Sequence, residues 1–234
     1  MSISTDPSAD YRASGQAVAR FLVERCQLQP DQAVLDVGCG VGRTAAALGT
    51  YLLPSARYEG FDIVDKEIAW CRSHLSARFP NFRFQTADVF NQFYNRSGQT
   101  PAAAFSFPYA DRTFDCAVVA SVFTHMLEAG VARYIHEIAR VLKPGGRCLA
   151  SFYLLNRESL AGIVEGTSTF TFAHSVDGCV VEDRHDPEVA VAYAEAKCRA
   201  LFADSGLTID EVVYGSWSSE RNQTQDLVIA SRPI

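Results

Sequence analysis

Residues 34–44 read VLDVGCGVGRT and stand between a short apolar run and a helix-like run of small residues. Such an apolar run is typical of a buried strand. The three glycines at alternate positions let the backbone turn sharply and let a ligand approach it closely. Doubly wound α/β folds bind nucleotides at a glycine loop between a strand and a helix, so this loop is the first candidate binding site.

Strand-like and helix-like segments alternate on both sides of this loop. The expected strands cover residues 33–35, 57–62, 82–86, 114–120, 147–155, 207–217 and 226–231, and the expected helices cover about 8–27, 44–50, 65–78, 131–142 and 187–205. Alternation implies right-handed crossovers and parallel pairing, whereas the short polar link before the last strand implies an antiparallel pair. The sequence therefore predicts an α/β fold: a doubly wound, mostly parallel seven-stranded sheet with helices on both faces and an antiparallel C-terminal strand pair.

Two long segments interrupt this pattern, at about 91–112 and about 156–186. Loops of such length inside a compact domain are usually functional or mobile. We expect residues 1–234 to form a single domain with an N-terminal helical segment at about 8–27 and insertions at these two places.

Composition excludes several classes of protein. The chain of 234 residues has a formal charge of −6 and a pI near 5.4, which disfavours nucleic acid and anionic lipid as partners. We expect no membrane contact and a cytoplasmic location, since no apolar run approaches the roughly 20 residues of a membrane span and the N-terminus is polar. The seven cysteines form no Cys-x-x-Cys pair and the five histidines are dispersed, so no metal site is expected.

The glycine loop fits one cofactor class better than another. Counted from Gly38 and Gly40, the third glycine of the dinucleotide fingerprint falls on Arg43, which makes a nicotinamide cofactor the weaker hypothesis. Asp36 ends the preceding strand, and a carboxylate aimed at the ligand suits a cationic group better than a pyrophosphate.

Residues 34–44 resemble motif I of the class I S-adenosylmethionine-dependent methyltransferases, and the resemblance extends over most of the chain. Residues 107–115 (FPYADRTFD) resemble the family's entry to the fourth strand, and residues 142–146 (LKPGG) its turn into the fifth. Residues 214–217 (YGSW) with 225–227 (QDL) resemble the tail of uncharacterised bacterial small-molecule members. We expect the LKPGG turn to end a helix and to contact no ligand.

The resemblance implies which residues hold the cofactor. Asp62, about 20 residues after Gly42, would accept both ribose hydroxyls, and Asp88 would accept the exocyclic amine of adenine. The residues expected to contact S-adenosylmethionine are Asp36, Gly38, Cys39, Gly40, Asp62, Ile63, Asp88, Val89 and Ser121.

The chemical class of the methyl acceptor is inferred mainly from motifs that the sequence lacks. No Asn-Pro-Pro-Tyr or Asp-Pro-Pro-Tyr segment follows the fourth strand and no Pro-Cys pair occurs, which disfavours base methylation. The paired acids of magnesium-dependent catechol-type enzymes have no clear counterpart, because Asp115 begins its strand. A small organic acceptor methylated on oxygen or nitrogen is therefore expected.

His125 follows the fourth strand at the carboxyl edge of the sheet. It is either a general base or a residue that packs beside the cofactor or caps the next helix. The family builds its acceptor pocket from the N-terminal segment and the insertions, which makes Tyr11, His174 and Trp217 candidate acceptor contacts. Trp217 equally suits packing under the last strands.

Three hypotheses follow. The first is a methyltransferase that converts S-adenosylmethionine to S-adenosylhomocysteine. The second is a nicotinamide-dependent oxidoreductase, and the third is a non-catalytic module that binds S-adenosylmethionine. We expect a monomer or a homodimer.

Overall fold

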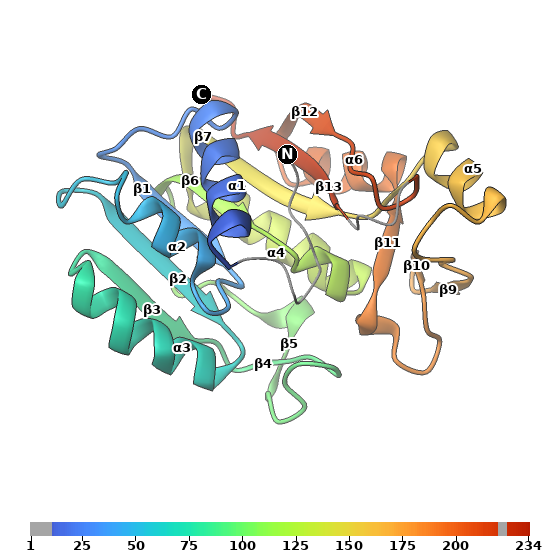
Figure 1. Cartoon of the computed structure of the whole chain (residues 1–234), viewed down its shortest axis with the longest axis horizontal. Coiled ribbons are helices and arrows are strands. Elements are labelled where there is room, and N and C mark those ends of the chain that lie inside the picture. The colour runs from blue at the N-terminus through green and yellow to red at the C-terminus, as the bar shows by residue number, and fades with distance from the viewer. Residues whose placement is uncertain (1–10, 220–223) are drawn as a thin grey trace.

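The computed structural model describes residues 11–219 and 224–234. A seven-stranded sheet with strand order β12-β13-β7-β6-β1-β2-β3 forms its centre (Figure 1). These strands are β1 (Ala33–Val37), β2 (Arg57–Asp62), β3 (Phe82–Thr86), β6 (Phe114–Val119), β7 (Leu142–Phe152), β12 (Thr208–Val213) and β13 (Asp226–Ser231). β13 runs antiparallel to β7 and β12, and the other pairs are parallel. The predicted fold class is confirmed.

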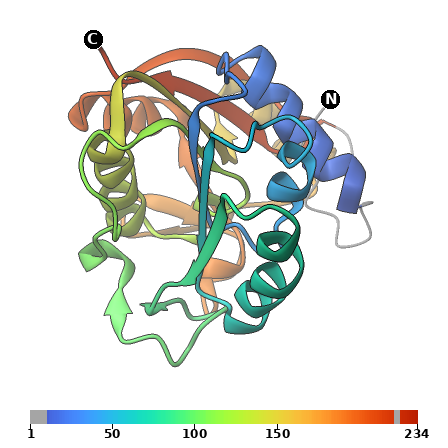
Figure 2. The same ribbon diagram turned by 90° about the vertical axis from the view of Figure 1, so that its left-hand side faces the viewer.

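Helices cover both faces of the sheet (Figures 1 and 2). One layer holds α1 (Tyr11–Glu24), α2 (Arg43–Leu48) and α3 (Asp65–Cys71), which continues as a π-helical turn over Arg72–Ser76; the other holds α4 (Glu128–Val141) and α6 (Glu195–Asp204). Each layer packs on its own apolar core. The predicted N-terminal helical segment corresponds to α1, and its first residues, 8–10, lie outside the described residues.

A smaller four-stranded sheet lies beside the carboxyl end of β7. It contains β8 (Leu154–Leu155), β9 (His174–Val176), β10 (Cys179–Val181) and β11 (Val191–Ala194), and α5 (Arg157–Glu165) adjoins it. The helix predicted from Pro187 is wrong over its first half: a short 3-10 turn, η4 (Pro187–Val189), leads into β11. Tyr193 has no exposed surface and pairs with Leu154 of β8, because β-branched and aromatic residues pack well in a strand once a partner edge is present.

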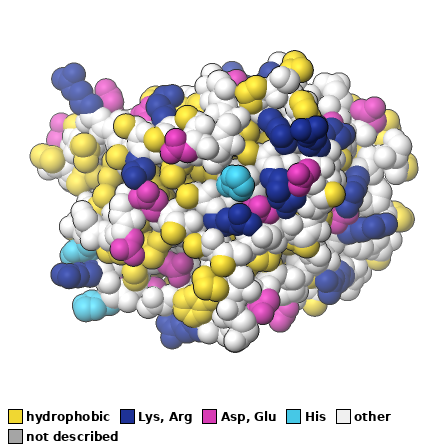
Figure 3. All heavy atoms as spheres, turned by 180° about the vertical axis from the view of Figure 1, so that it is seen from behind, with side chains coloured by type: hydrophobic (Ala, Val, Ile, Leu, Met, Phe, Trp, Pro, Cys, Tyr) yellow, Lys and Arg dark blue, Asp and Glu magenta, His cyan; other side chains and the backbone are white. Residues whose placement is uncertain are grey.

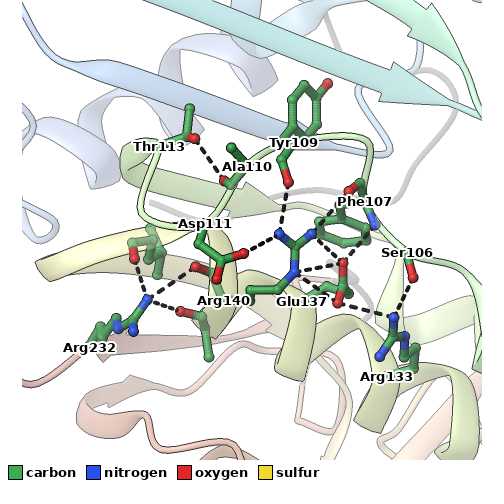
Figure 4. A network of polar contacts seen from close by, with 12 residues as sticks. Ser106, Phe107, Tyr109, Ala110, Asp111, Thr113, Arg133, Glu137, Arg140 and Arg232 are labelled. Carbon is green, nitrogen blue, oxygen red and sulfur yellow. Dashed lines mark hydrogen bonds and ion pairs between the residues drawn. The ribbon is translucent and has the colours of Figure 1, made fainter.

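The segment at 91–112 is tied to α4 by a buried carboxylate (Figure 4). Two short parallel strands, β4 (Val89–Phe90) and β5 (Thr100–Pro101), begin this region, and a 3-10 turn, η2 (Ala102–Ala104), follows. The Glu137 side chain, 2% exposed, accepts the N–H of Phe107 at 2.7 Å and lies between Arg133 at 3.1 Å and Arg140 at 2.6 Å. These contacts hold the end of the segment against the helix.

Charges are mixed over the face seen in Figure 3, where basic and acidic side chains lie among one another. Within residues 11–219 and 224–234, no helix is both long enough and apolar enough to cross a membrane.

We predict that Glu137→Gln lowers the free energy of unfolding by about 2 kcal/mol at pH 7, because a buried acceptor of arginine hydrogen bonds loses its charge. Burial raises the pKa of Glu137, but hydrogen bonds from Arg140 and Phe107 outweigh it and the net shift is downward. The stabilisation is therefore complete above the ordinary carboxyl pKa and is lost as the pH falls through the lowered value.

Urea unfolding at pH 7 and pH 3 measures both effects. Asp111→Asn is the control, because Asp111 pairs with the same Arg140 on the surface and its loss should change little. Equal stability of wild type and Glu137→Gln at pH 7 would contradict the anchoring role.

Candidate active site

The glycine loop is fastened to the end of β2. The N–H groups of Gly38 and Cys39 donate to the carbonyl oxygen of Phe61 at 2.9 and 3.0 Å. Gly38, Gly40 and Gly42 have φ values of 69°, 52° and 72°, a region that glycine adopts readily. A Cβ on Gly38 would lie 2.3 Å from Cγ2 of Val122, so the loop after β6 packs directly against this glycine.

Asp62 lies where the loop and β2 meet. Its Oδ2 accepts the N–H of Gly40 at 2.8 Å, and its Oδ1 accepts the N–H of Val64 at 3.0 Å. Burial raises the pKa of Asp62, and these two hydrogen bonds oppose the rise. Each carboxylate oxygen retains further acceptor capacity, so the side chain is oriented to receive two more hydrogen bonds from a ligand.

A cavity of about 590 Å³ opens beside this carboxylate. It lies at the carboxyl ends of β1, β2 and β6, where ligands bind in open α/β sheets. Nine of the residues singled out from the sequence line it: Tyr11, Gly38, Cys39, Gly40, Asp62, Ile63, Val89, Ser121 and His125. The volume is within the range of about 300–1,000 Å³ that is usual for small-molecule sites.

Asp36 does not line this cavity, contrary to the expectation that its carboxylate faces the ligand. The side chain is 2% exposed and accepts a hydrogen bond from the Tyr58 hydroxyl. Successive side chains of a strand point to opposite faces, and Asp36 shares its face with Val34, beneath the α1–α3 layer. Burial raises the pKa of Asp36 to about 7.

Three other predicted contacts also do not line the cavity. Asp88 is exposed, and its Oδ1 accepts the N–H of Gln99 at 3.0 Å. His174 is exposed on β9. Trp217 is 1% exposed within an aromatic cluster and donates from Nε1 to Asp226 at 2.8 Å, which matches its alternative interpretation as a packing residue.

One ring nitrogen of His125 is used in a hydrogen bond to the backbone. It ends a 3-10 turn, η3 (Phe123–His125), and its Nδ1 lies 3.1 Å from the carbonyl oxygen of Glu188. Because a carbonyl only accepts, Nδ1 carries the proton and Nε2 of the neutral ring is left as an acceptor. Burial lowers the pKa of His125, which favours this neutral form near pH 7.

Tyr11 of α1 lines the cavity. Its hydroxyl donates to the carbonyl oxygens of Val41 at 3.0 Å and Gly42 at 3.1 Å, so the N-terminal helix is docked on the glycine loop itself. Burial raises the pKa of this hydroxyl. The contact of Tyr11 with an acceptor stays a prediction.

Tyr94 and Glu188 line the cavity but were not identified from the sequence. The Tyr94 ring packs edge-on against His125, with ring centroids 5.3 Å apart. Asn91 shapes this loop: its Oδ1 accepts the N–H of Tyr94 at 2.8 Å and its Nδ2 donates to the carbonyl oxygen of His125 at 3.1 Å. Tyr94 lies in the long polar segment at 91–112, which the sequence did indicate as a possible functional loop. Glu188 lies within the helix predicted at 187–205, so no feature of the sequence pointed to it.

No three His, Cys, Asp or Glu side chains of the described ranges are grouped as a metal site would require.

A family model described as a methyltransferase domain matches residues 35–150, the span that holds the glycine loop, Asp62 and His125. The chain belongs to the class I S-adenosylmethionine-dependent methyltransferases. Methyltransferase GfsG of Streptomyces halstedii is 32% identical over 178 residues, which cover 74% of this chain and 56% of that protein. O-methyltransferase cnsE of Penicillium expansum is 31% identical over 147 residues, 61% of this chain and 46% of that one.

One solved structure shares the fold of nearly the whole of this chain. The Burkholderia thailandensis 1,6-didemethyltoxoflavin-N1-methyltransferase, with S-adenosylhomocysteine bound, superposes with a TM-score of 0.63 at 17% identity and covers 95% of this chain and 80% of that one. This chain spans only about half the length of the curated relatives named above.

We predict that Gly38→Ala destabilises this methyltransferase by more than 2 kcal/mol, because both the positive φ and the contact with Val122 oppose a Cβ. Gly166→Ala is the matched control: its φ is 74° but its Cβ would meet nothing within 4 Å. The control therefore isolates the cost of the backbone conformation, about 1–2 kcal/mol. Equal losses in thermal or urea unfolding would show that the loop does not press on Val122.

Proposed function

We propose that this protein transfers the methyl group of S-adenosylmethionine to an oxygen or nitrogen of a small organic acceptor, with S-adenosylhomocysteine as the second product. The observation that carries the proposal is the oriented carboxylate of Asp62, placed beside Gly38 and Gly40 at the cavity. The relatives' names, a methyltransferase and an O-methyltransferase, support the reaction class.

The residues around Asp62 fit this cofactor. Two acceptor oxygens suit a ribose diol, Ile63 and Val89 offer apolar surface to an adenine ring, and Gly38 and Gly40 leave room for close approach to the backbone. When bound, the sulfonium supplies an activated methyl group that a nucleophile displaces in line. The protein has to align the acceptor, exclude water and, for a hydroxyl or ammonium acceptor, remove a proton.

His125 is suited to remove that proton. Its Nδ1 proton is held by the Glu188 carbonyl, so Nε2 receives a proton from the acceptor and the ring becomes imidazolium. The cavity wall beside it is aromatic at Tyr94 and apolar at Met126 and Val122, which favours an organic acceptor and keeps water from the reacting atoms.

We also propose that the acceptor pocket is built by Tyr11 and by the insertion at 91–112, because Asn91, Tyr94 and Ala102 of that insertion line the cavity. The insertion at 156–186 contributes none of the lining residues, although Glu188 follows it closely. A single domain over residues 1–234, a monomeric or homodimeric state, and a cytoplasmic location remain predictions from the sequence.

The two other hypotheses make different demands on this site. A nicotinamide cofactor would place a pyrophosphate at the loop, where Arg43 replaces the third fingerprint glycine and the carboxylates of Asp62 and Glu67 stand close by. A non-catalytic module would have no use for a neutral imidazole at the cavity wall.

We predict that Asp62→Ala weakens binding of S-adenosylhomocysteine at least tenfold, because two ribose hydroxyls lose a charged acceptor. Calorimetric titration measures the affinity, with reduced nicotinamide dinucleotides titrated separately. Asp88→Ala is the comparison: the family pattern predicts weaker binding through lost contact with adenine, whereas the exposed position of Asp88, which does not line the cavity, predicts unchanged affinity. Tight binding of a nicotinamide and none of S-adenosylhomocysteine would overturn the proposal.

We predict that His125→Gln reduces the rate of methyl transfer 10²–10⁴-fold with cofactor affinity within about threefold of wild type. Product formation is measured as S-adenosylhomocysteine across an acceptor screen of phenols, alcohols and amines. The wild-type rate should rise with pH through the lowered pKa of His125 and then level off, because only the neutral ring accepts a proton. A variant with the wild-type rate and pH profile would remove His125 as the base.

A further inference from the structure

The segment that follows β6 reaches the cavity through Ser121 and His125, and a buried side chain from the far end of the sequence holds it. Gln225 immediately precedes β13 and is 1% exposed. Its Oε1 accepts a hydrogen bond from Oγ of Ser121 at 3.1 Å, and its Nε2 donates to Oγ1 of Thr124 at 3.3 Å. One amide therefore clamps two positions of the same short segment.

The backbone at Ser121 needs such a clamp. Its φ of 59° lies in the left-handed region, which residues other than glycine rarely adopt and which persists only where the surroundings impose it. The N–H of Ser121 donates to Oγ of Ser151 on β7 at 2.7 Å, and Ser151 has no exposed surface. Ser151 thus holds the backbone of Ser121 while Gln225 holds its side chain.

The turn at Ser121 decides where η3 begins, and η3 carries His125. We propose that Gln225 is a positioning residue of the methyl-transfer site, which fixes the Ser121–His125 segment so that both residues line the cavity. The inference rests on the proposed function for the identity of the reaction, whereas the clamp itself stands on the contacts above.

The next residue offers a matched control. Asp226 is 2% exposed, and its carboxylate accepts hydrogen bonds from Trp217 Nε1 at 2.8 Å and from the N–H groups of Leu154 and Gly215 at 2.7 Å each. None of these partners lies in the Ser121–His125 segment. Asp226→Asn therefore weakens hydrogen bonds at the same end of β13 but leaves those of Gln225 with Ser121 and Thr124 in place.

The experiment compares wild type, Gln225→Leu, which keeps the volume but loses both hydrogen bonds, and Asp226→Asn. Affinity for S-adenosylhomocysteine is measured by calorimetry, thermal unfolding reports stability, and NMR titration of the five histidine rings reports the pKa of His125, assigned with His125→Gln. Tyr94 packs against the His125 ring, and Glu188 contacts it through its backbone carbonyl. The other titratable side chains that line the same cavity are Tyr11, Cys39, Arg43, Asp62, Glu67 and Tyr134, and neither variant alters any of them.

We expect both variants to unfold at lower temperature. Gln225→Leu alone should bind S-adenosylhomocysteine about tenfold more weakly and should raise the pKa of His125 toward its ordinary value, because the released segment admits water. A folded Gln225→Leu protein with affinity within twofold and an unchanged His125 titration would overturn the inference, as would equal changes in Asp226→Asn.

If Gln225→Leu does not fold, Thr124→Val removes one of the two hydrogen bonds and should show the same changes at a smaller size. Failure of the wild type to bind S-adenosylhomocysteine would count against the proposed function, whereas the histidine titration would still decide whether Gln225 positions His125.

Discussion

The hydrogen bonds between the glycine loop and the end of β2 are the constraint on which the rest of the site depends. The Phe61 carbonyl receives two N–H groups from the loop, and Asp62 receives a third from Gly40. These bonds fix the loop on the neighbouring strand, so the turn is held beside the carboxylate of Asp62, the residue that we propose accepts the ribose hydroxyls. The same hydrogen bonds orient the Asp62 carboxylate and place the backbone of Gly38 and Gly40 along the cavity.

The missing side chain at Gly38 extends this constraint to the next crossover. Val122 occupies the space where a Cβ would stand, and thereby brings the loop after β6 against the loop after β1. The base candidate His125 lies three residues further along and is anchored on the opposite side by the Glu188 carbonyl. Packing at a single glycine therefore links the glycine loop, which we propose holds the cofactor, to the segment that carries the proposed base.

Buried polar groups complete the arrangement from distant parts of the sequence. Gln225 and Ser151 hold the turn at Ser121, Asp226 holds Trp217, and Glu137 holds Phe107. Each is nearly or wholly buried, so each would be costly without its partners. Their hydrogen bonds fix the position of each loop, because apolar contacts alone would leave these loops free to shift against the sheet.

Local pattern was sufficient for the seven strands of the central sheet, most helices, the glycine loop and the position of Asp62 at the end of β2, since these depend on neighbours within a few residues or on a fixed order along the chain. Pattern was insufficient where the direction of a side chain decides its role. Asp36 lies near the end of β1 but points to the face opposite the one expected, and Asp88 follows β3 but is exposed to solvent.

Apolar spacing alone predicted a helix at 187–205, but the partner edges of β8 and β10 make residues 191–194 a strand. Thus the sequence by itself determined the fold class and the position of the glycine loop. Only the tertiary structure brought Tyr94, Glu188 and Gln225 to His125 and Ser121, because these contacts join residues far apart in the chain that no local periodicity records.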